Sequence, residues 1–273
     1  MTLGIDIGGT TISLGLVQGA QVVKEVCVPS FASNATQEQT LQYLASQIEA
    51  LFFPAVEKIG IGVPSVADPE EGIVYDAANI PSWDVVPLKE KLEARFGVPV
   101  KVNNDANCFA LGAAAMLEDV PHTVVGVTLG TGTGVGIVVN GTLFSGSHCG
   151  AGEICSLAYN GADYESFCSK KFFTVRGLNP KDVAIRACQG DPEANALFWE
   201  FGHHMGELLT AVMYAYDADC ILLGGGIAKA FPLFEAPMWA TLREKYPYYR
   251  SLEELTIKVL PQQNLALVGA ALL

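Results

Sequence analysis

Two glycine- and threonine-rich segments have the composition of phosphate-binding turns. The first contains Gly8, Gly9, Thr10 and Thr11, and the second runs through Gly130, Thr131, Gly132, Thr133 and Gly134. Glycine lets backbone N–H groups face an anion without an obstructing Cβ, and threonine hydroxyls add donors. Either segment alone fits an ordinary hairpin turn equally well. Two such segments favour a pair of turns that hold a polyphosphate from both sides. We call them the first turn (residues 8–11) and the second turn (residues 130–134).

Carboxylates lie next to these segments. Asp6 comes just before the first turn, where it could hold Mg²⁺ through water. Asp105 lies in Asn103-Asn104-Asp105-Ala106-Asn107, at an expected strand-to-helix junction. There it could accept a hydroxyl proton as an alcohol attacks a γ-phosphorus. The same place suits a helix N-cap, and for this segment alone the cap is the favoured interpretation.

Two further groups could bind a sugar and a nucleoside. Glu153 and Glu165 lie in a segment rich in Gly, Ser and Tyr, where carboxylates suit bidentate hydrogen bonds to vicinal hydroxyls. Solvated loop charge is the alternative for either glutamate. Gly224, Gly225 and Gly226 could let a base and ribose lie on the backbone, or could form a tight strand-to-helix turn.

The elements that must position these residues occur twice. Strands are expected at 3–7 and 12–17 around the first turn, and at 124–129 and 135–139 around the second. Asn140-Gly141 predicts a further hairpin turn. Apolar spacing predicts helices at 37–53, 85–96, 104–117 and 197–216, and strands at 59–63, 98–102 and 220–223. Two halves that begin alike predict a duplicated α/β fold with a cleft between lobes.

Composition excludes several classes of function. The net charge of −13 argues against nucleic acid and against an anionic membrane surface. Nucleotides remain possible ligands, because Mg²⁺ and backbone amides can supply a local positive field. A Walker GxxxxGK[ST] loop is absent, and a strand follows the first turn where a Rossmann motif needs a helix. Seven cysteines without a CxxC pair, and a start without a signal-peptide pattern, predict a cytoplasmic protein.

Taken together, the motifs resemble the ROK family (repressors, open reading frames and sugar kinases) of the actin-like ATPase fold. The motifs that carry the resemblance are Asp6–Thr11, Gly62–Asp68, Asn79–Trp83, Asn103–Asn107, Leu129–Gly136, Gly150–Glu153 and Leu223–Ile227. Their order and spacing span nearly the whole chain. The resemblance implies a two-lobed, ribonuclease H-like α/β fold with duplicated βββαβα-type domains and a central cleft. We expect an N-terminal lobe at 1–118, joined by 262–273, and a C-terminal lobe at 119–261.

The resemblance also implies an activity and roles for single residues. The expected activity is ATP- and Mg²⁺-dependent phosphorylation of a hexose, usually at the 6-hydroxyl, as in a glucokinase. Asp105 matches the family's catalytic base. The first turn and Thr131 match its phosphate loops, and Gly224–Gly226 its adenosine loop. The residues that match its sugar contacts are Asn79, Asn104, Glu153 and Glu165.

One segment departs from the family pattern. The family's GEIGH becomes Gly152-Glu153-Ile154-Cys155-Ser156, so Ser156 replaces a histidine that ligates structural zinc, and the clustered cysteines are missing. We therefore expect no zinc, and a shortened loop held by packing around Tyr159, Tyr164 and Phe167. The alternatives are an N-acetylmannosamine or N-acetylglucosamine kinase, and a non-catalytic sugar-sensing or partner-binding protein. An actin-like ATPase or a kinase of another metabolite also stays open, because a fold does not fix the substrate. Family members are often dimers, so a homodimer is a further expectation.

Overall fold

The computed structural model describes residues 1–77 and 79–273, which form two compact units. Unit 1 comprises Met1–Val120, Gly136–Ala151 and Gln262–Leu273, and unit 2 comprises Pro121–Val135 and Gly152–Pro261. The C-terminal segment 262–273 thus packs with the N-terminal part of the chain, and so does 136–151. The lobe boundaries expected from the sequence, 1–118 with 262–273 and 119–261, stay a prediction.

Unit 1 is built on a five-stranded sheet in the order β3-β2-β1-β4-β8. The central strand β1 (Thr2–Ile7) pairs antiparallel with β2 (Thr11–Gln18) and parallel with β4 (Lys58–Val63). The outer strands are β3 (Gln21–Pro29) and β8 (Val100–Asn104). The predicted hairpin around the first turn is confirmed. Because β1, β4 and β8 are parallel, their carboxyl ends meet at one edge of the sheet.

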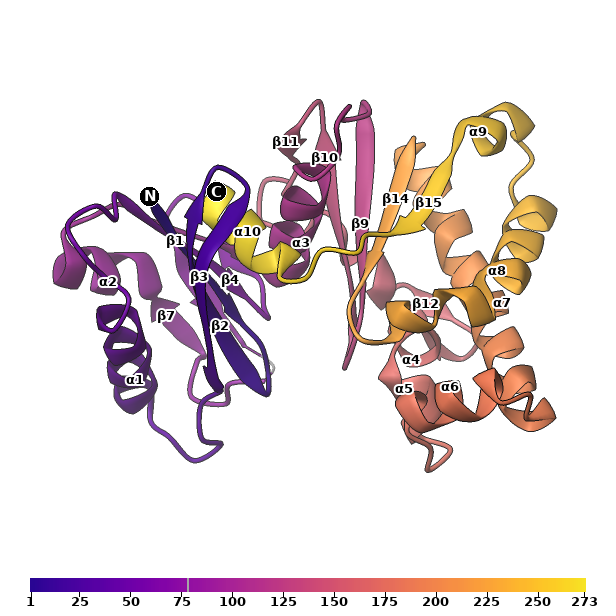
Figure 1. Ribbon diagram of the computed structural model, residues 1–273, viewed down its shortest axis with the longest axis horizontal. Coiled ribbons are helices and arrows are strands. Elements are labelled where there is room, and N and C mark those ends of the chain that lie inside the picture. The colour runs from indigo at the N-terminus through magenta and orange to yellow at the C-terminus, as the bar shows by residue number, and fades with distance from the viewer. Residues whose placement is uncertain (78) are drawn as a thin grey trace. The chain divides into compact units, whose positions relative to one another are not determined.

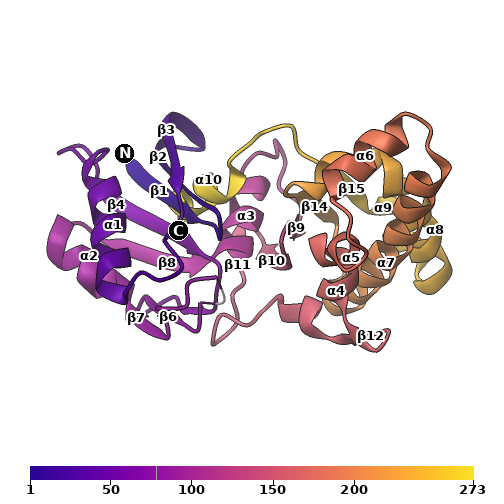
Figure 2. The ribbon, with the colours of Figure 1, turned by 90° about the horizontal axis from the view of Figure 1, so that it is seen from below.

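Helices cover both faces of this sheet (Figures 1 and 2). One side carries α1 (Gln37–Glu49) and α2 (Leu88–Phe96), and the other carries α3 (Asp105–Ala114) and α10 (Leu265–Leu272). Glycine allows α10 to lie directly on the strands and on α3. A Cβ at Gly60 of β4 would be 1.7 Å from Ala270 O, and one at Gly269 would be 1.6 Å from Cys108 O. No larger residue fits at either position without moving backbone.

Helix boundaries differ from the sequence prediction near prolines. Val85–Pro87 is not helical but forms β7, in a small antiparallel sheet with β5 (Ala67–Asp68) and β6 (Ile73–Tyr75). Proline disfavours helical geometry in the residue before it, and Pro87 then becomes the N-cap of α2. Helix α1 ends at Glu49, four residues before its predicted end at Phe53. Helix α3 ends at Ala114, three residues before its predicted end.

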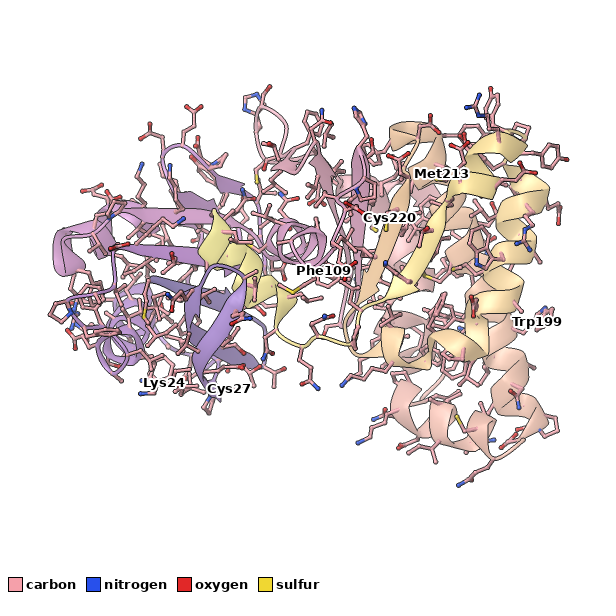
Figure 3. All side chains as sticks on the ribbon, turned by 45° about the horizontal axis from the view of Figure 1, so that its top comes forward. Lys24, Cys27, Phe109, Trp199, Met213 and Cys220 are labelled. Atoms are coloured by element: carbon pink, nitrogen blue, oxygen red, sulfur yellow. The ribbon has the colours of Figure 1, made fainter. Side chains whose placement is uncertain are left out.

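Unit 2 contains a parallel arrangement of β9 (Thr123–Leu129), β14 (Cys220–Gly224) and β15 (Thr256–Val259), joined by the first residues of β10 (Thr133–Val139). Helix α7 (Pro192–Tyr216) starts five residues before its predicted start, because Asp191 caps it. Figure 3 shows Met213 of α7 inside, whereas Trp199 on the same helix is 62% exposed. The shorter helices are α4 (Tyr164–Cys168), α5 (Lys170–Thr174), α6 (Pro180–Cys188), α8 (Phe231–Lys245) and α9 (Tyr249–Glu254).

Helix α7 packs along α8, over a core of phenylalanines. Within unit 1, Asn140 and Gly141 both adopt positive φ between β10 and β11 (Thr142–Leu143), which confirms the predicted hairpin turn. Among the helices of residues 1–77 and 79–273, none is long and apolar enough to cross a membrane.

Candidate functional site

The first turn joins β1 to β2. Gly8 N–H donates to Thr11 O at 2.9 Å, which closes the turn, and Gly9, Thr10 and Thr11 are exposed. Asn79 lies against it, since a Cβ at Gly9 would be 3.3 Å from Asn79 Cγ. The structure therefore brings the expected phosphate turn and one expected sugar contact together within unit 1.

Asp6 and Asp105 lie at the carboxyl ends of the parallel strands. Asp6 is opposite Gly62 in the β1–β4 register, and Gly62 is opposite Asn103 in β8. A Cβ at Gly62 would be 3.5 Å from Asp105 Cα, so no side chain separates the strand from the start of α3. Burial raises the pKa of Asp6 to about 6. Burial, and then the charges of Asp6 and Asp105, raise the pKa of the Cys108 thiol, which lies close to both carboxylates.

Asn104, and not Asp105, caps helix α3. Asn104 Oδ1 accepts from Ala106 N at 2.9 Å and from Asn107 N at 3.3 Å, and Asn104 Nδ2 donates to Ser65 O at 3.2 Å. Asp105 occupies the first helical position, where its Oδ1 accepts from Ala106 N at 2.8 Å. The interpretation of Asp105 as the N-cap, which the segment alone favoured, is therefore wrong.

Asn103 joins the site although the sequence did not single it out. Its Oδ1 accepts from Asn107 Nδ2 at 2.9 Å, from Asn104 N at 2.8 Å and from the Cys149 thiol at 3.2 Å. Its Nδ2 is 3.3 Å from Ser145 Oγ. The segment around Cys149 is thereby fixed to the end of β8. No local pattern signals this contact, since the two partners are 46 residues apart.

The second turn belongs to unit 2 and is tied to a distant segment. Within it, Gly130 N donates to Gly132 O at 2.9 Å, and Thr131 is exposed. Thr133 Oγ1 donates to Cys168 O at 2.8 Å, and Lys170 N donates to Gly130 O at 2.9 Å. The turn and residues 168–170 thus form one connected piece.

Glu165 lies on this piece. Its Oε2 accepts from Thr133 N at 3.3 Å, and a Cβ at Gly132 would be only 2.4 Å from that oxygen. Glu153 begins the 3₁₀ helix η1 (Glu153–Ser156). Partial burial, and then the charge of Glu165, raise the pKa of Glu153. The two glutamates are therefore electrostatic neighbours, and Glu165 at least is more than a solvated loop charge.

The Gly224–Gly226 loop lies next to the second turn. Gly224 is opposite Thr128 in the β14–β9 register. Gly225 has φ +85°, and a Cβ there would be 2.4 Å from Leu129 O, so this position requires glycine. Around Gly226, no described atom outside its two chain neighbours lies within 4 Å of where a Cβ would be, which leaves room beside the backbone. The loop leads into the 3₁₀ helix η2 (Ile227–Ala230).

Aromatic packing holds the shortened loop, as expected. The rings of Tyr159 and Tyr164 stack at 4.4 Å and 12°, and Phe167 meets Tyr159 edge-on at 5.4 Å. Tyr159 Oη is 2.9 Å from Nδ1 of the buried His204. Strands β12 (Ala158–Tyr159) and β13 (Ala162–Asp163) form a hairpin that the sequence analysis missed, although Asn160-Gly161 is a strong hairpin signal. In the part of the chain that the structure describes, no three His, Cys, Asp or Glu side chains are grouped to hold a metal ion.

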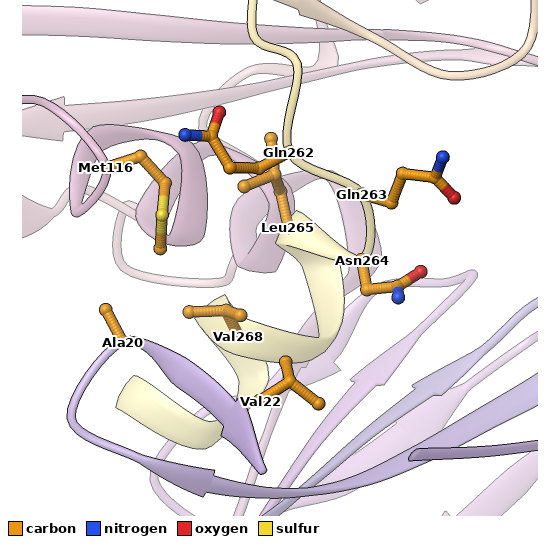
Figure 4. Close-up of a pocket in the computed structure, with 8 residues that line it drawn as sticks. All are labelled: Ala20, Val22, Met116, Gln262, Gln263, Asn264, Leu265 and Val268. Atoms are coloured by element: carbon orange, nitrogen blue, oxygen red, sulfur yellow. The ribbon is translucent and has the colours of Figure 1, made fainter. Parts of the chain in front are cut away.

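One further hollow of unit 1, of about 350 Å³, lies beside the start of α10 (Figure 4). Ala20, Val22, Met116 and the residues 262–265 and 268 line it, and none of them is a predicted site residue.

The fold and its relatives define the class. The structure has the actin-like ATPase fold, and it superposes on the glucokinase of Streptomyces griseus, solved with glucose and AMPPNP, with a TM-score of 0.83. That match covers 99% of this chain and 97% of the other at 26% identity. Residues 2–273 match the ROK family, and the chain belongs to it.

Curated relatives include two enzymes that act on different sugars. The glucokinase of Thermotoga maritima is 28% identical over 280 residues, covering 90% of this chain and 87% of that protein. An N-acetyl-D-glucosamine kinase of Escherichia coli is 29% identical over 269 residues, covering 87% and 88%.

Proposed function

We propose that this ROK sugar kinase transfers the γ-phosphoryl group of ATP to the 6-hydroxyl of a hexose, with glucose as the first candidate. The sugar kinases among its relatives support the reaction type. The glucose and AMPPNP held by the Streptomyces griseus enzyme support the pairing of a hexose with an adenine nucleotide.

The observation that carries the proposal is that Asn104 is the N-cap of α3, while Asp105 follows it and lies near Asp6. Asp105 occupies the first helical position, where its Oδ1 accepts from Ala106 N. Asp105 lies near a second carboxylate, Asp6, at the carboxyl ends of parallel strands, where α/β proteins place ligands. A carboxylate in that position suits the abstraction of a hydroxyl proton.

The phosphates of ATP would be bound by both turns, and adenosine by Gly224–Gly226. The exposed first turn and the exposed Thr131 offer backbone N–H groups and hydroxyls to anionic oxygens. Open space beside Gly226 suits the approach of a nucleoside to the backbone. Mg²⁺ fits the oxygen donors of Asp6, whose pKa is raised by burial and which a cation would stabilise in its charged form. When bound, Mg²⁺ would neutralise charge on the phosphates.

The sugar would be held by Asn79, Asn104, Glu153 and Glu165. The Asn104 amide has two hydrogens and donates one to Ser65 O, so the second suits a sugar hydroxyl. In the reaction, Asp105 accepts the proton of the 6-hydroxyl while that oxygen attacks the γ-phosphorus. The bond to the β–γ bridging oxygen breaks, and ADP leaves. Positioning supplies most of the acceleration.

An N-acetylglucosamine or N-acetylmannosamine kinase is the second candidate, favoured by the Escherichia coli relatives. Substrate choice falls on the loop in which Ser156 replaces the family histidine. A non-catalytic sugar sensor is the third, and Asp105 with its neighbouring carboxylate argues against it. The same proposal places the enzyme in the cytoplasm, where ATP is present and where the seven free thiols stay reduced. We further propose that it is a homodimer and that it binds no nucleic acid.

A panel of sugars with ATP and Mg²⁺, read by coupled ADP release, tests the proposal. Glucose-dependent turnover above that of N-acetylglucosamine, N-acetylmannosamine, fructose and mannose is the expected result. Preference for an acetylated sugar would select the second candidate. Sugar binding without ADP release would select the third and refute the proposed activity.

A further inference from the structure

Lys171 is the cation that faces the expected sugar-binding glutamate. It lies in the first turn of α5 and forms an ion pair between its Nζ and Glu165 Oε1. The Lys171 side chain is 50% exposed and that of Glu165 is 31% exposed. Water therefore screens the pair only in part.

The other carboxylate oxygen of Glu165 fixes the orientation of the group. Oε2 accepts from Thr133 N–H of the second turn, and only the missing Cβ of Gly132 leaves room for it. Glu165 is thus held at two points, by a backbone donor on one oxygen and by an ammonium on the other. A carboxylate held at both oxygens cannot rotate without breaking one contact.

The backbone beneath Lys171 is fixed as well. Ser169 Oγ accepts from Lys171 N at 3.1 Å and caps α5, and Lys170 N is bonded to Gly130 O. These hydrogen bonds fix the backbone that carries the Lys171 ammonium relative to the second turn. Peptide dipoles at the start of a helix favour negative charge, so the helix does not explain a lysine there.

Lys171 brings a positive charge to a region in which carboxylates repel one another. Glu153, Asp163 and Glu165 surround this region in a chain of net charge −13. Hydrogen bonds from Ser166, and to a smaller degree Lys171, lower the pKa of Asp163, so the field of Lys171 reaches beyond its partner. Without the ammonium, repulsion from Glu153 would favour rotation of Glu165 out of this orientation.

We propose that Lys171 is a positioning residue for the sugar, which holds Glu165 against the second turn in the orientation that binds sugar hydroxyls. The inference rests on the proposed function, because it assumes that Glu165 contacts the substrate. Lys171 itself need not touch sugar or nucleotide.

The test is a double-mutant cycle read by steady-state kinetics with glucose, or with the sugar that the panel selects. Lys171→Met should raise the KM for the sugar about five-fold, the scale of one partly exposed ion pair, with kcat and the KM for ATP within two-fold of wild type. Lys171→Arg should restore the KM. In a Glu165→Gln background, Lys171→Met should have no further effect on the KM for the sugar.

Lys181→Met, in the exposed first turn of α6, is the matched control for loss of one positive charge and should leave all constants unchanged. Lys171→Gln serves as a second variant if thermal unfolding shows that Lys171→Met is misfolded.

Three results would overturn the inference. They are an unchanged KM for the sugar, an effect that persists in the Glu165→Gln background, and a change confined to the KM for ATP. Absence of wild-type turnover on every sugar would instead overturn the proposed function, so the two failures are distinguishable.

Discussion

Replacing Asp6 by asparagine should make the protein more stable at neutral pH and less active. Burial raises the pKa of Asp6 from 3.8 to about 6. The folded protein therefore keeps a proton on this carboxyl that the unfolded chain has already lost. Ionisation of Asp6 then opposes folding, increasingly from about pH 4 to pH 6, and its full cost is present above pH 6.

The difference between the two pKa values corresponds to roughly 3 kcal/mol. Asp6→Asn should therefore raise the free energy of unfolding at pH 7.5 by up to about 3 kcal/mol, less the cost of burying the amide. Near pH 4 the folded carboxyl is neutral, so the gain should vanish. Urea unfolding at both pH values measures this difference. Asp84→Asn, an exposed aspartate of the same unit, is the control and should show no gain.

Activity gives the second half of this prediction. If Asp6 holds Mg²⁺ through water, the variant should need more Mg²⁺ for half-maximal turnover, and Mg²⁺ with AMPPNP should stabilise it less than wild type. A change in the free energy of unfolding that is equal at pH 4 and pH 7.5 would refute the electrostatic reasoning. An unchanged Mg²⁺ requirement would refute the assigned role.

Three other changes test single contacts. Gly132→Ala puts a Cβ within 2.4 Å of a Glu165 oxygen, so the KM for the sugar should rise at least five-fold; a KM equal to wild type would contradict the contact. Tyr159→Phe leaves His204 Nδ1 buried without its 2.9 Å partner and should cost about 1–2 kcal/mol in urea unfolding, whereas an unchanged midpoint would count against the loop being held there. Repulsion from Glu165 contributes to the raised pKa of Glu153, so Glu165→Gln should lower that pKa in an NMR titration of the glutamate side chains; a rise would exclude the repulsion between the two.

Local pattern predicted much of the fold. Alternating apolar residues located β1, β2, β9 and β10, and the order of motifs located the family. The prediction was wrong at Val85–Pro87, which was expected to be helical, because Pro87 disfavours helical geometry in the residue before it. It also missed the β12–β13 hairpin, although Asn160-Gly161 is a strong hairpin signal.

The sequence predicted which residues belong to the candidate site better than it predicted their contacts. Residue types alone could not decide whether Asn104 or Asp105 caps α3, because both side chains suit that position. Contacts such as Cys149 with Asn103 depend on chain segments that only folding brings together. The pair of Lys171 and Glu165 at Gly132 is of the same kind, since the turn lies more than 30 residues earlier in the chain.

Sugar-dependent ADP release by Asp105→Ala, measured beside wild type at saturating ATP, Mg²⁺ and sugar, tests the central claim most directly. Loss of the base should lower kcat by about 10²–10⁴-fold, with ATP binding by calorimetry unchanged. A variant whose kcat stays within a few-fold of wild type would contradict the assignment of Asp105 as the group that accepts the hydroxyl proton.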